Sequence, residues 1–218
     1  MYSREYGRLS FMIKGVHSRK KGKHSVMFQP LFILDLDVYY KTSRELQIIK
    51  ESSVAFTPYN IYSDIRKSCV ALFLGETLNS ILKEESPNSE LFDFIEDSIK
   101  YYDQIDSGFA NFHLAFLAGL SGFLGFEPRK QTDVNQIFFD MKNGAFSALP
   151  PIHKHYSNPE TSSILARIFD SSFDNVNSIP LTGTQRNEIL DSLLSYYSLH
   201  LTGLTSIKSF EILKEVFH

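Results

Sequence analysis

The sequence predicts an α+β protein in which a β-rich N-terminal domain, residues 1–58, is followed by a helical domain, residues 59–218. Apolar and polar side chains alternate in the first part of the chain, and the period becomes helical from about residue 60. A central stretch, residues 108–124, is apolar on nearly every face, which is typical of a buried helix. Together these three patterns indicate a β-rich part followed by a helical part.

Three strands are expected in the N-terminal domain. Residues 8–14 alternate apolar and polar side chains, as a half-buried strand does. Residues 27–40 and 46–56 are rich in β-forming residues, and Pro30 indicates a bulge, an edge or a strand start in the earlier of them. Short strands separated by turns predict a small barrel or sandwich rather than a parallel sheet.

Six helices are expected in the second domain. They cover about 60–82, 87–105, 108–124, 159–173, 183–201 and 206–217. Ser86, Asn158 and either Thr182 or Thr184 supply N-cap side chains for three of them. Gly125 ends the central helix. A short hairpin is expected near 136–149, because its centre carries the turn pair Asn-Gly.

Composition limits the classes of protein to which the chain can belong. It is 43% hydrophobic, enough for a sizeable core, but no apolar run is long enough to span a membrane. The single cysteine, Cys69, excludes an internal disulfide framework and a multi-cysteine zinc site. Its first residues lack a signal-peptide pattern, so we expect a cytoplasmic protein. We also expect no metal or cofactor.

Charge is distributed unevenly along the chain. Residues 1–50 carry ten Lys/Arg and four Asp/Glu, whereas the whole chain has a net charge of −3. The remainder is therefore strongly acidic. A basic block next to an acidic body is typical of nucleic-acid binding, although a solvated basic loop would give the same composition.

The basic charge is concentrated in one loop. Its five cations are Lys14, Arg19, Lys20, Lys21 and Lys23. Such a loop between strands can follow a phosphate backbone and release counterions. Phe11 and Phe28 on the adjoining strands could stack on bases, or they could belong to the core.

Other candidate sites have simpler explanations. Asp35 and Asp37 could hold Mg²⁺ or act as acid and base in a nuclease, but polar residues on the solvent side of a strand show the same spacing. His153 and His155 could share a metal but lack an obvious third ligand. No nucleophile and base have recognisable spacing, so we expect no catalytic residues and no enzymatic activity.

Several motifs in order resemble the bacterial RecO recombination mediators. The segment 14–17 (KGVH) leads through the basic loop to 28–31 (FQPL). The resemblance continues through 76–78 (ETL), 89–93 (SELFD), 112–117 (FHLAFL) and 124–128 (LGFEP). It also includes Tyr196-Tyr197 and Lys208-Ser209 near the end of the chain, so nearly the whole length is covered.

The resemblance implies an N-terminal oligonucleotide-binding (OB) β-barrel, here partial, and an all-helical C-terminal domain with a short β-hairpin insertion. It implies a nucleoid-associated, non-enzymatic DNA repair protein that binds single- and double-stranded DNA and anneals strands. Such a protein displaces the single-stranded-DNA-binding protein and loads RecA with RecR. The DNA contacts of the family correspond here to Arg8, Lys14, Arg19, Lys20, Lys21 and Lys23.

Three features depart from the family pattern. From the family pattern we expect the first part of the barrel to be missing and the chain to begin inside it, so a protein-interaction scaffold with little DNA binding is the alternative function. Residues 129–151 lack the four cysteines of the zinc module found in many relatives, so no zinc is expected. Ala110-Asn111 replaces the arginines that precede a docking pocket for the single-stranded-DNA-binding protein. Phe112 and Phe116 would line that pocket, or they are core residues.

Overall fold

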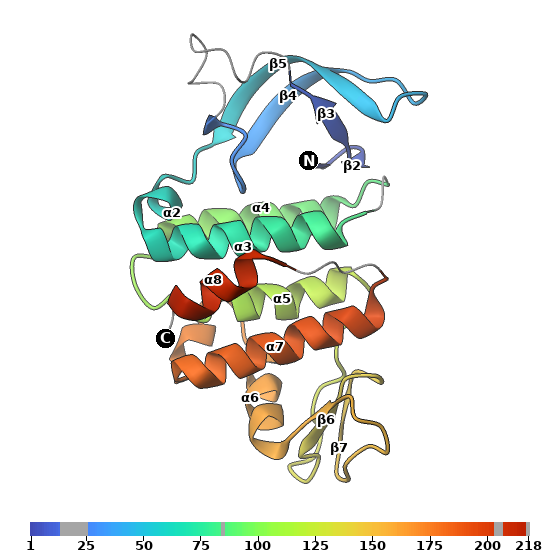
Figure 1. Ribbon diagram of the computed structural model, residues 1–218, viewed down its shortest axis with the longest axis vertical. Coiled ribbons are helices and arrows are strands. Elements are labelled where there is room, and N and C mark those ends of the chain that lie inside the picture. Colours follow the sequence, from blue (N-terminus) through green and yellow to red (C-terminus); the bar gives the residue numbers. More distant parts are fainter. Residues whose placement is uncertain (14–25, 84–85, 203–206, 217–218) are drawn as a thin grey trace. The chain divides into compact units, whose positions relative to one another are not determined.

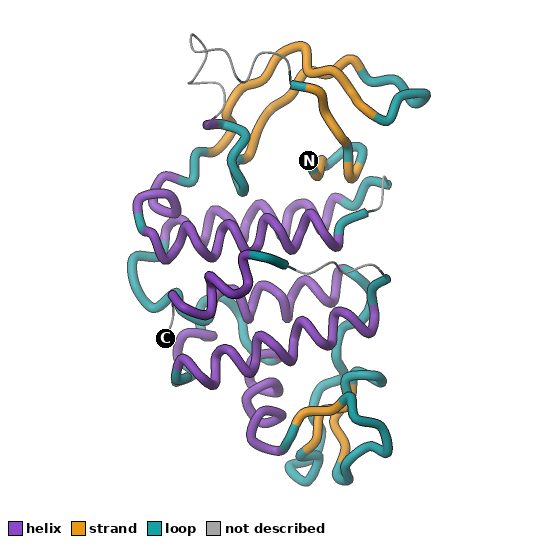
Figure 2. The backbone as a smooth tube through the Cα atoms, viewed as in Figure 1, coloured by secondary structure: helices purple, strands orange, loops and turns teal. Residues whose placement is uncertain are grey.

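The computed structural model describes residues 1–13, 26–83, 86–202 and 207–216, and shows strands and helices in both halves of the chain (Figures 1 and 2). The chain divides into two compact units, Met1–Gln104 and Ile105–His218. The N-terminal unit therefore contains helices as well as strands, and the C-terminal unit contains a small sheet as well as helices. The mixed α+β class is confirmed.

Two sheets lie in the N-terminal unit. Strand β1 (Tyr2–Ser3) pairs antiparallel with β2 (Gly7–Arg8), and β3 (Ser10–Met12), β4 (Ile33–Tyr39) and β5 (Leu46–Phe56) form a second sheet in the order β3–β5–β4. Strands β4 and β5 are antiparallel, but β3 and β5 are parallel, which the sequence did not predict. The described strands do not close into a barrel, so the partial OB-barrel is not confirmed.

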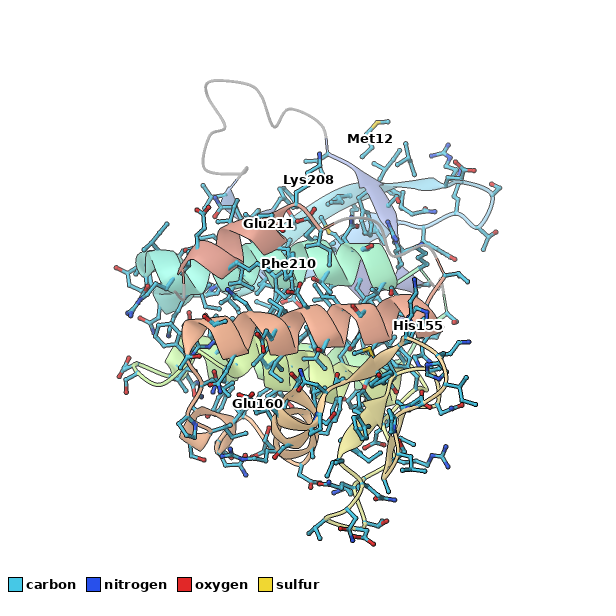
Figure 3. The ribbon with its side chains drawn as sticks, turned by 60° about the horizontal axis from the view of Figure 1, so that its bottom comes forward. Met12, His155, Glu160, Lys208, Phe210 and Glu211 are labelled. Atoms are coloured by element: carbon cyan, nitrogen blue, oxygen red, sulfur yellow. The ribbon has the colours of Figure 1, made fainter. Side chains whose placement is uncertain are left out.

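The alternation of burial predicted for residues 8–14 is present, but the single strand expected there is divided into β2 and β3, which belong to different sheets. Leu9 is buried, whereas Met12 is 48% exposed and points away from the sheet (Figure 3). Strand β4 begins three residues after Pro30, which agrees with a strand start near that proline. The chain enters β4 through Leu31, whose φ of 65° lies in the left-handed region that turns use.

The N-terminal unit also contains, among the residues that the structure describes, the helices α2 (Tyr59–Ser63), α3 (Ile65–Ile81) and α4 (Ser89–Gln104). The expectation of one helix over 60–82 was wrong at Asp64, because its carboxylate accepts a hydrogen bond from the Arg66 backbone and caps a new helix. Asn88, rather than Ser86, accepts from a backbone N–H in the first turn of α4.

The segment before β4 packs on these helices. The Tyr62 hydroxyl donates to the carbonyl of Pro30 at 2.7 Å, and the rings of Phe32 and Tyr62 lie 5.6 Å apart. A Cβ atom added to Gly75 of α3 would lie only 2.8 Å from the Cβ of Pro30. The close approach of segment and helix therefore requires glycine at position 75.

Helices of the C-terminal unit begin largely where the sequence predicts. They are α5 (Phe112–Phe123), α6 (Pro159–Phe169), α7 (Gly183–His200) and α8 (Ser209–Val216). Asn158 caps α6, and Thr182 forms a capping box with Gln185 at the start of α7. Helix α5 is buried along most of its length, as its composition predicts.

A small sheet occupies the expected hairpin region of the C-terminal unit. Strands β6 (Phe138–Asp140) and β7 (Ala145–Ser147) pair antiparallel, and Gly144 in their turn has a φ of 56°. A third strand, β8 (Tyr156–Ser157), pairs with β6 and was not predicted. In the described ranges, every helix is too short or too polar to traverse a lipid bilayer.

We expect Gly75→Ala to lower the free energy of unfolding of the N-terminal unit by ~1–3 kcal/mol, because the rigid ring of Pro30 must move away from the new methyl group. In an unobstructed helix the same change stabilises by about 1 kcal/mol. Urea unfolding followed by circular dichroism measures the difference.

Gly122→Ala is the matched control, because its nearest neighbour would be Glu127 at an ordinary 3.8 Å. Stability should there stay the same or rise. Equal effects at positions 75 and 122 would contradict the packing of Pro30 on α3.

Candidate nucleic-acid interface

Most of the predicted DNA-binding cations cannot be placed. They are Lys14, Arg19, Lys20, Lys21 and Lys23, and all five lie outside the described residues. Their contact with phosphate stays a prediction. Arg8, the sixth, is described.

Arg8 lies in β2, and its guanidinium group caps helix α3. One nitrogen, Nη1, donates to the carbonyl oxygens of Asn79 at 3.1 Å and Leu82 at 3.0 Å. The other, Nη2, lies 3.4 Å from the Asn79 side-chain oxygen. Carbonyls at a helix C-terminus lack intrahelical partners and carry partial negative charge, so a cation stabilises them. Arg8 therefore has a structural role, and its contact with DNA stays a prediction.

The two phenylalanines beside the basic loop are neither fully buried nor fully exposed. Phe11 lies in β3 and Phe28 in the turn before β4, and both are half-buried. The neighbouring Met27 is buried. Base stacking by either ring stays a prediction.

The two aspartates of β4 lie on its exposed side. Asp35 and Asp37 are both exposed, and the Asp37 carboxylate forms a 2.6 Å ion pair with Lys50 of β5. Within the described ranges, no group of three or more His, Cys, Asp or Glu side chains is placed to hold a metal ion. The arrangement matches the simpler explanation, polar residues on the solvent side of a strand.

Sequence reasoning missed a cluster at the turn between β4 and β5. Tyr39 and Tyr40 are 56% and 39% exposed, and the side chains of Lys41 and Arg44 that follow them are also exposed. Two tyrosines beside two cations were the available signal in the sequence. They were assigned to the end of a strand because residues 27–40 are rich in β-forming residues.

The proposed partner-binding aromatics lie in the C-terminal unit. Phe112 and Phe116 of α5 are each 1% exposed, and the ring of Phe112 lies 5.0 Å from that of Phe173. This burial favours the core alternative. A direct role in partner binding stays a prediction.

A buried polar network surrounds the start of α5. The Asn111 side chain donates to the carbonyls of Val176 and Ile179, and it accepts from Arg186 of α7 at 2.9 Å. His113 is fully buried next to this network, and burial together with the charge of Arg186 lowers its pKa to about 3. His113 is therefore neutral at physiological pH.

The histidine pair of the C-terminal unit lies beside the small sheet. His153 Nε2 is 3.3 Å from the carboxylate of Asp140, and the rings of His153 and His155 are 6.1 Å apart. Among the residues that the structure describes, His153, His155 and Asp140 are not placed to hold a metal ion together.

The single cysteine, Cys69, lies in α3 of the N-terminal unit. Burial raises the pKa of its thiol, which disfavours the reactive thiolate.

Comparison with known proteins covers both units. A family model described as Recombination protein O N terminal matches residues 1–57, and one described as Recombination protein O C terminal matches residues 62–209. The DNA repair protein RecO of Phocaeicola vulgatus is 35% identical over 217 residues, which are 100% of this chain and 90% of that protein. The DNA repair protein RecO of Flavobacterium psychrophilum is 35% identical over 213 residues, 97% of this chain and 87% of that protein.

The two family models meet close to the expected domain boundary after residue 58, whereas the compact units divide after Gln104. Helices α3 and α4 therefore match the C-terminal family model but belong to the N-terminal compact unit. The position of the domain boundary stays a prediction.

We expect Arg8→Gln to destabilise the N-terminal unit by about 1 kcal/mol, since its charged hydrogen bonds to the end of α3 are removed at a partly exposed site. Urea unfolding measures this change. Arg44→Gln removes an exposed cation without such hydrogen bonds and should shift stability by less than about 0.5 kcal/mol. Unchanged stability of the Arg8 variant would refute the capping role.

His113 should make the C-terminal unit sensitive to acid. The unfolded chain binds a proton near pH 6.5, whereas the folded chain does not until about pH 3. Stability is therefore complete above pH 6.5 and falls by up to about 1.4 kcal/mol per pH unit below it. Unfolding measured from pH 7 to pH 4 should show a shallower slope in His113→Gln, and identical slopes would count against a neutral buried histidine.

Proposed function

The chain belongs to the RecO family of DNA repair proteins, and from this membership we propose that it is a recombination mediator that binds single- and double-stranded DNA. It anneals complementary strands in the nucleoid and, together with RecR, helps RecA to replace the single-stranded-DNA-binding protein. The observation that carries the proposal is the match of both family models, which together span nearly the whole chain.

The charge distribution supports DNA binding independently of the family. Ten cations in the first 50 residues belong to a chain whose net charge is negative. A protein that neutralises phosphates with such a block releases condensed counterions, which favours binding to any DNA sequence. Capture of two strands on a basic surface raises their local concentration and needs no covalent step, so the proposed mechanism is not enzymatic.

The proposal assigns DNA contact mainly to the basic loop. The residues concerned are Lys14, Arg19, Lys20, Lys21 and Lys23, with Arg8 beside them. The guanidinium group of Arg8 already donates hydrogen bonds to the carbonyls at the end of α3. In this proposal it therefore holds β2 against α3 and contributes less to phosphate binding than the loop does.

Docking of the single-stranded-DNA-binding protein is assigned to the C-terminal unit near α5. Because Phe112 and Phe116 are buried, they would support this surface from inside rather than contact the partner. An interaction scaffold with little DNA binding is the second candidate function. It is favoured by the absence of barrel closure among the described strands.

Salt dependence of DNA binding tests the proposal. Fluorescence anisotropy of a labelled single-stranded oligonucleotide should give an affinity that falls linearly with salt on logarithmic axes. Changing Arg19, Lys20, Lys21 and Lys23 together to Ala should weaken binding and reduce the slope by about 0.7 for each phosphate that the variant no longer neutralises.

A matched variant controls for net charge. It changes four exposed cations of the C-terminal unit to Ala, namely Arg129, Lys130, Lys142 and Lys154. This control should bind DNA nearly as the parent protein does. Undetectable binding by the parent protein even at low salt would overturn the mediator proposal and leave the scaffold.

A further inference from the structure

The turn between β4 and β5, drawn in teal between two orange strands in Figure 2, is held by the side chain of one glutamine. Gln47 is only 2% exposed, and its side-chain oxygen accepts from the Lys41 backbone N–H at 2.9 Å. Its side-chain nitrogen donates to the carbonyls of Lys41 at 3.0 Å and Arg44 at 2.7 Å. One buried glutamine thus holds both ends of the turn. Binding of a ligand here costs less conformational entropy than it would on an unsupported loop.

The two tyrosines at this turn, Tyr39 and Tyr40, have different surroundings. The ring of Tyr40 stacks on Tyr6 from the β1–β2 turn, with centroids 4.4 Å apart and an interplanar angle of 30°. Tyr39 precedes it at the end of β4, and successive strand side chains point to opposite faces. Tyr39 is the more exposed of the two, so its ring offers an aromatic face to a ligand.

The two cations of the turn differ from other cations of the same unit. Arg4, Lys50 and Lys100 form ion pairs with carboxylates, and Arg8 and Lys67 donate to helix carbonyls. In the part of the unit that the structure describes, neither Lys41 nor Arg44 meets a carboxylate. Their charges remain available to an anion.

Charge along the hairpin restricts where an anionic ligand can bind. Asp35, Asp37 and Glu51 are exposed in the middle of the hairpin, and Asp37 and Glu51 are directly paired in register. The turn carries one exposed carboxylate, Glu45, beside its two cations, so its net charge is positive. A phosphate backbone is therefore repelled by the carboxylates of the strands and attracted by the turn. The turn, rather than the face of the sheet, is therefore the favourable position for a polyanion.

We propose that the β4–β5 turn is a second DNA contact, specific for single strands, at which Tyr39 stacks on an unpaired base while Lys41 and Arg44 bind the flanking phosphates. A base inside a duplex cannot present its face to an isolated tyrosine, whereas every unpaired base can. The inference rests on the proposed DNA binding and extends it by naming a place where single strands are preferred.

The test compares single-stranded and duplex oligonucleotides of equal length with the full chain. Tyr39→Ala should weaken single-strand binding about 5- to 100-fold, the range expected for loss of one stacked base, and should change duplex binding less than about twofold. Tyr39→Phe keeps the ring and should bind as the parent protein does. Lys41→Ala with Arg44→Ala should reduce the single-strand salt slope by about 1.4.

Controls with matched chemistry come from elsewhere in the chain. Tyr59→Ala removes a tyrosine that is 72% exposed, and Lys142→Ala with Lys154→Ala removes the same charge from the C-terminal unit. Both should bind like the parent protein. Single-strand binding by Tyr39→Ala within twofold of the parent, or an equal loss for duplex, would overturn the turn site.

The proposed function and the turn site can fail separately. If the parent protein binds no DNA, both are overturned. If the parent binds and only the basic-loop variant loses affinity, DNA binding stands and the turn site is overturned. Photocrosslinking of the parent protein to an oligonucleotide containing 5-iodouracil decides the case even if a variant fails to fold. A crosslink on Tyr39 or Tyr40 supports the site, and crosslinks confined to other peptides refute it.

Discussion

The architecture of the N-terminal unit depends on one buried positive charge. Lys67 of α3 is 3% exposed, and its ammonium group donates to the carbonyls of Tyr102 and Asp103 at the C-terminal end of α4. The Asp103 carboxylate in turn accepts from the backbone N–H of Ile61 in α2 at 2.8 Å. A buried cation without such partners would be strongly destabilising, so the three helices are held in one arrangement. The segment before β4 packs on α3, where Pro30 lies against Gly75. The β4–β5 hairpin, which carries the candidate turn, directly follows that segment in the chain.

Much of the fold could be predicted because its helices carry local end signals. Asn158 before a proline places the start of α6 correctly. Of the two threonines considered for the start of α7, Thr182 is the cap. Prediction failed where a residue type is compatible with two environments, as at Asp64, which sits in a helical pattern but caps a new helix. The parallel pairing of β3 with β5 could not be predicted, since it joins strands distant in sequence and no local pattern encodes it.

The candidate interface was predicted only in part. Composition locates the basic loop and the order of motifs identifies the family, but neither shows that Arg8 is held by helix carbonyls. The turn at Tyr39 was missed because its rigidity comes from Gln47, a polar residue that a sequence pattern does not mark as buried. Phe112 was assigned two possible roles, and its burial depends on aromatic neighbours such as Phe173 that only the tertiary structure supplies.

In the proposed function, this protein brings complementary DNA strands together without cutting them. The most direct measurement is the annealing rate of two complementary oligonucleotides, each covered by single-stranded-DNA-binding protein, followed by fluorescence energy transfer and then by a denaturing gel. We expect the added protein to accelerate annealing and both strands to be recovered at full length. Annealing no faster than without the protein, or recovery of shortened strands, would contradict it.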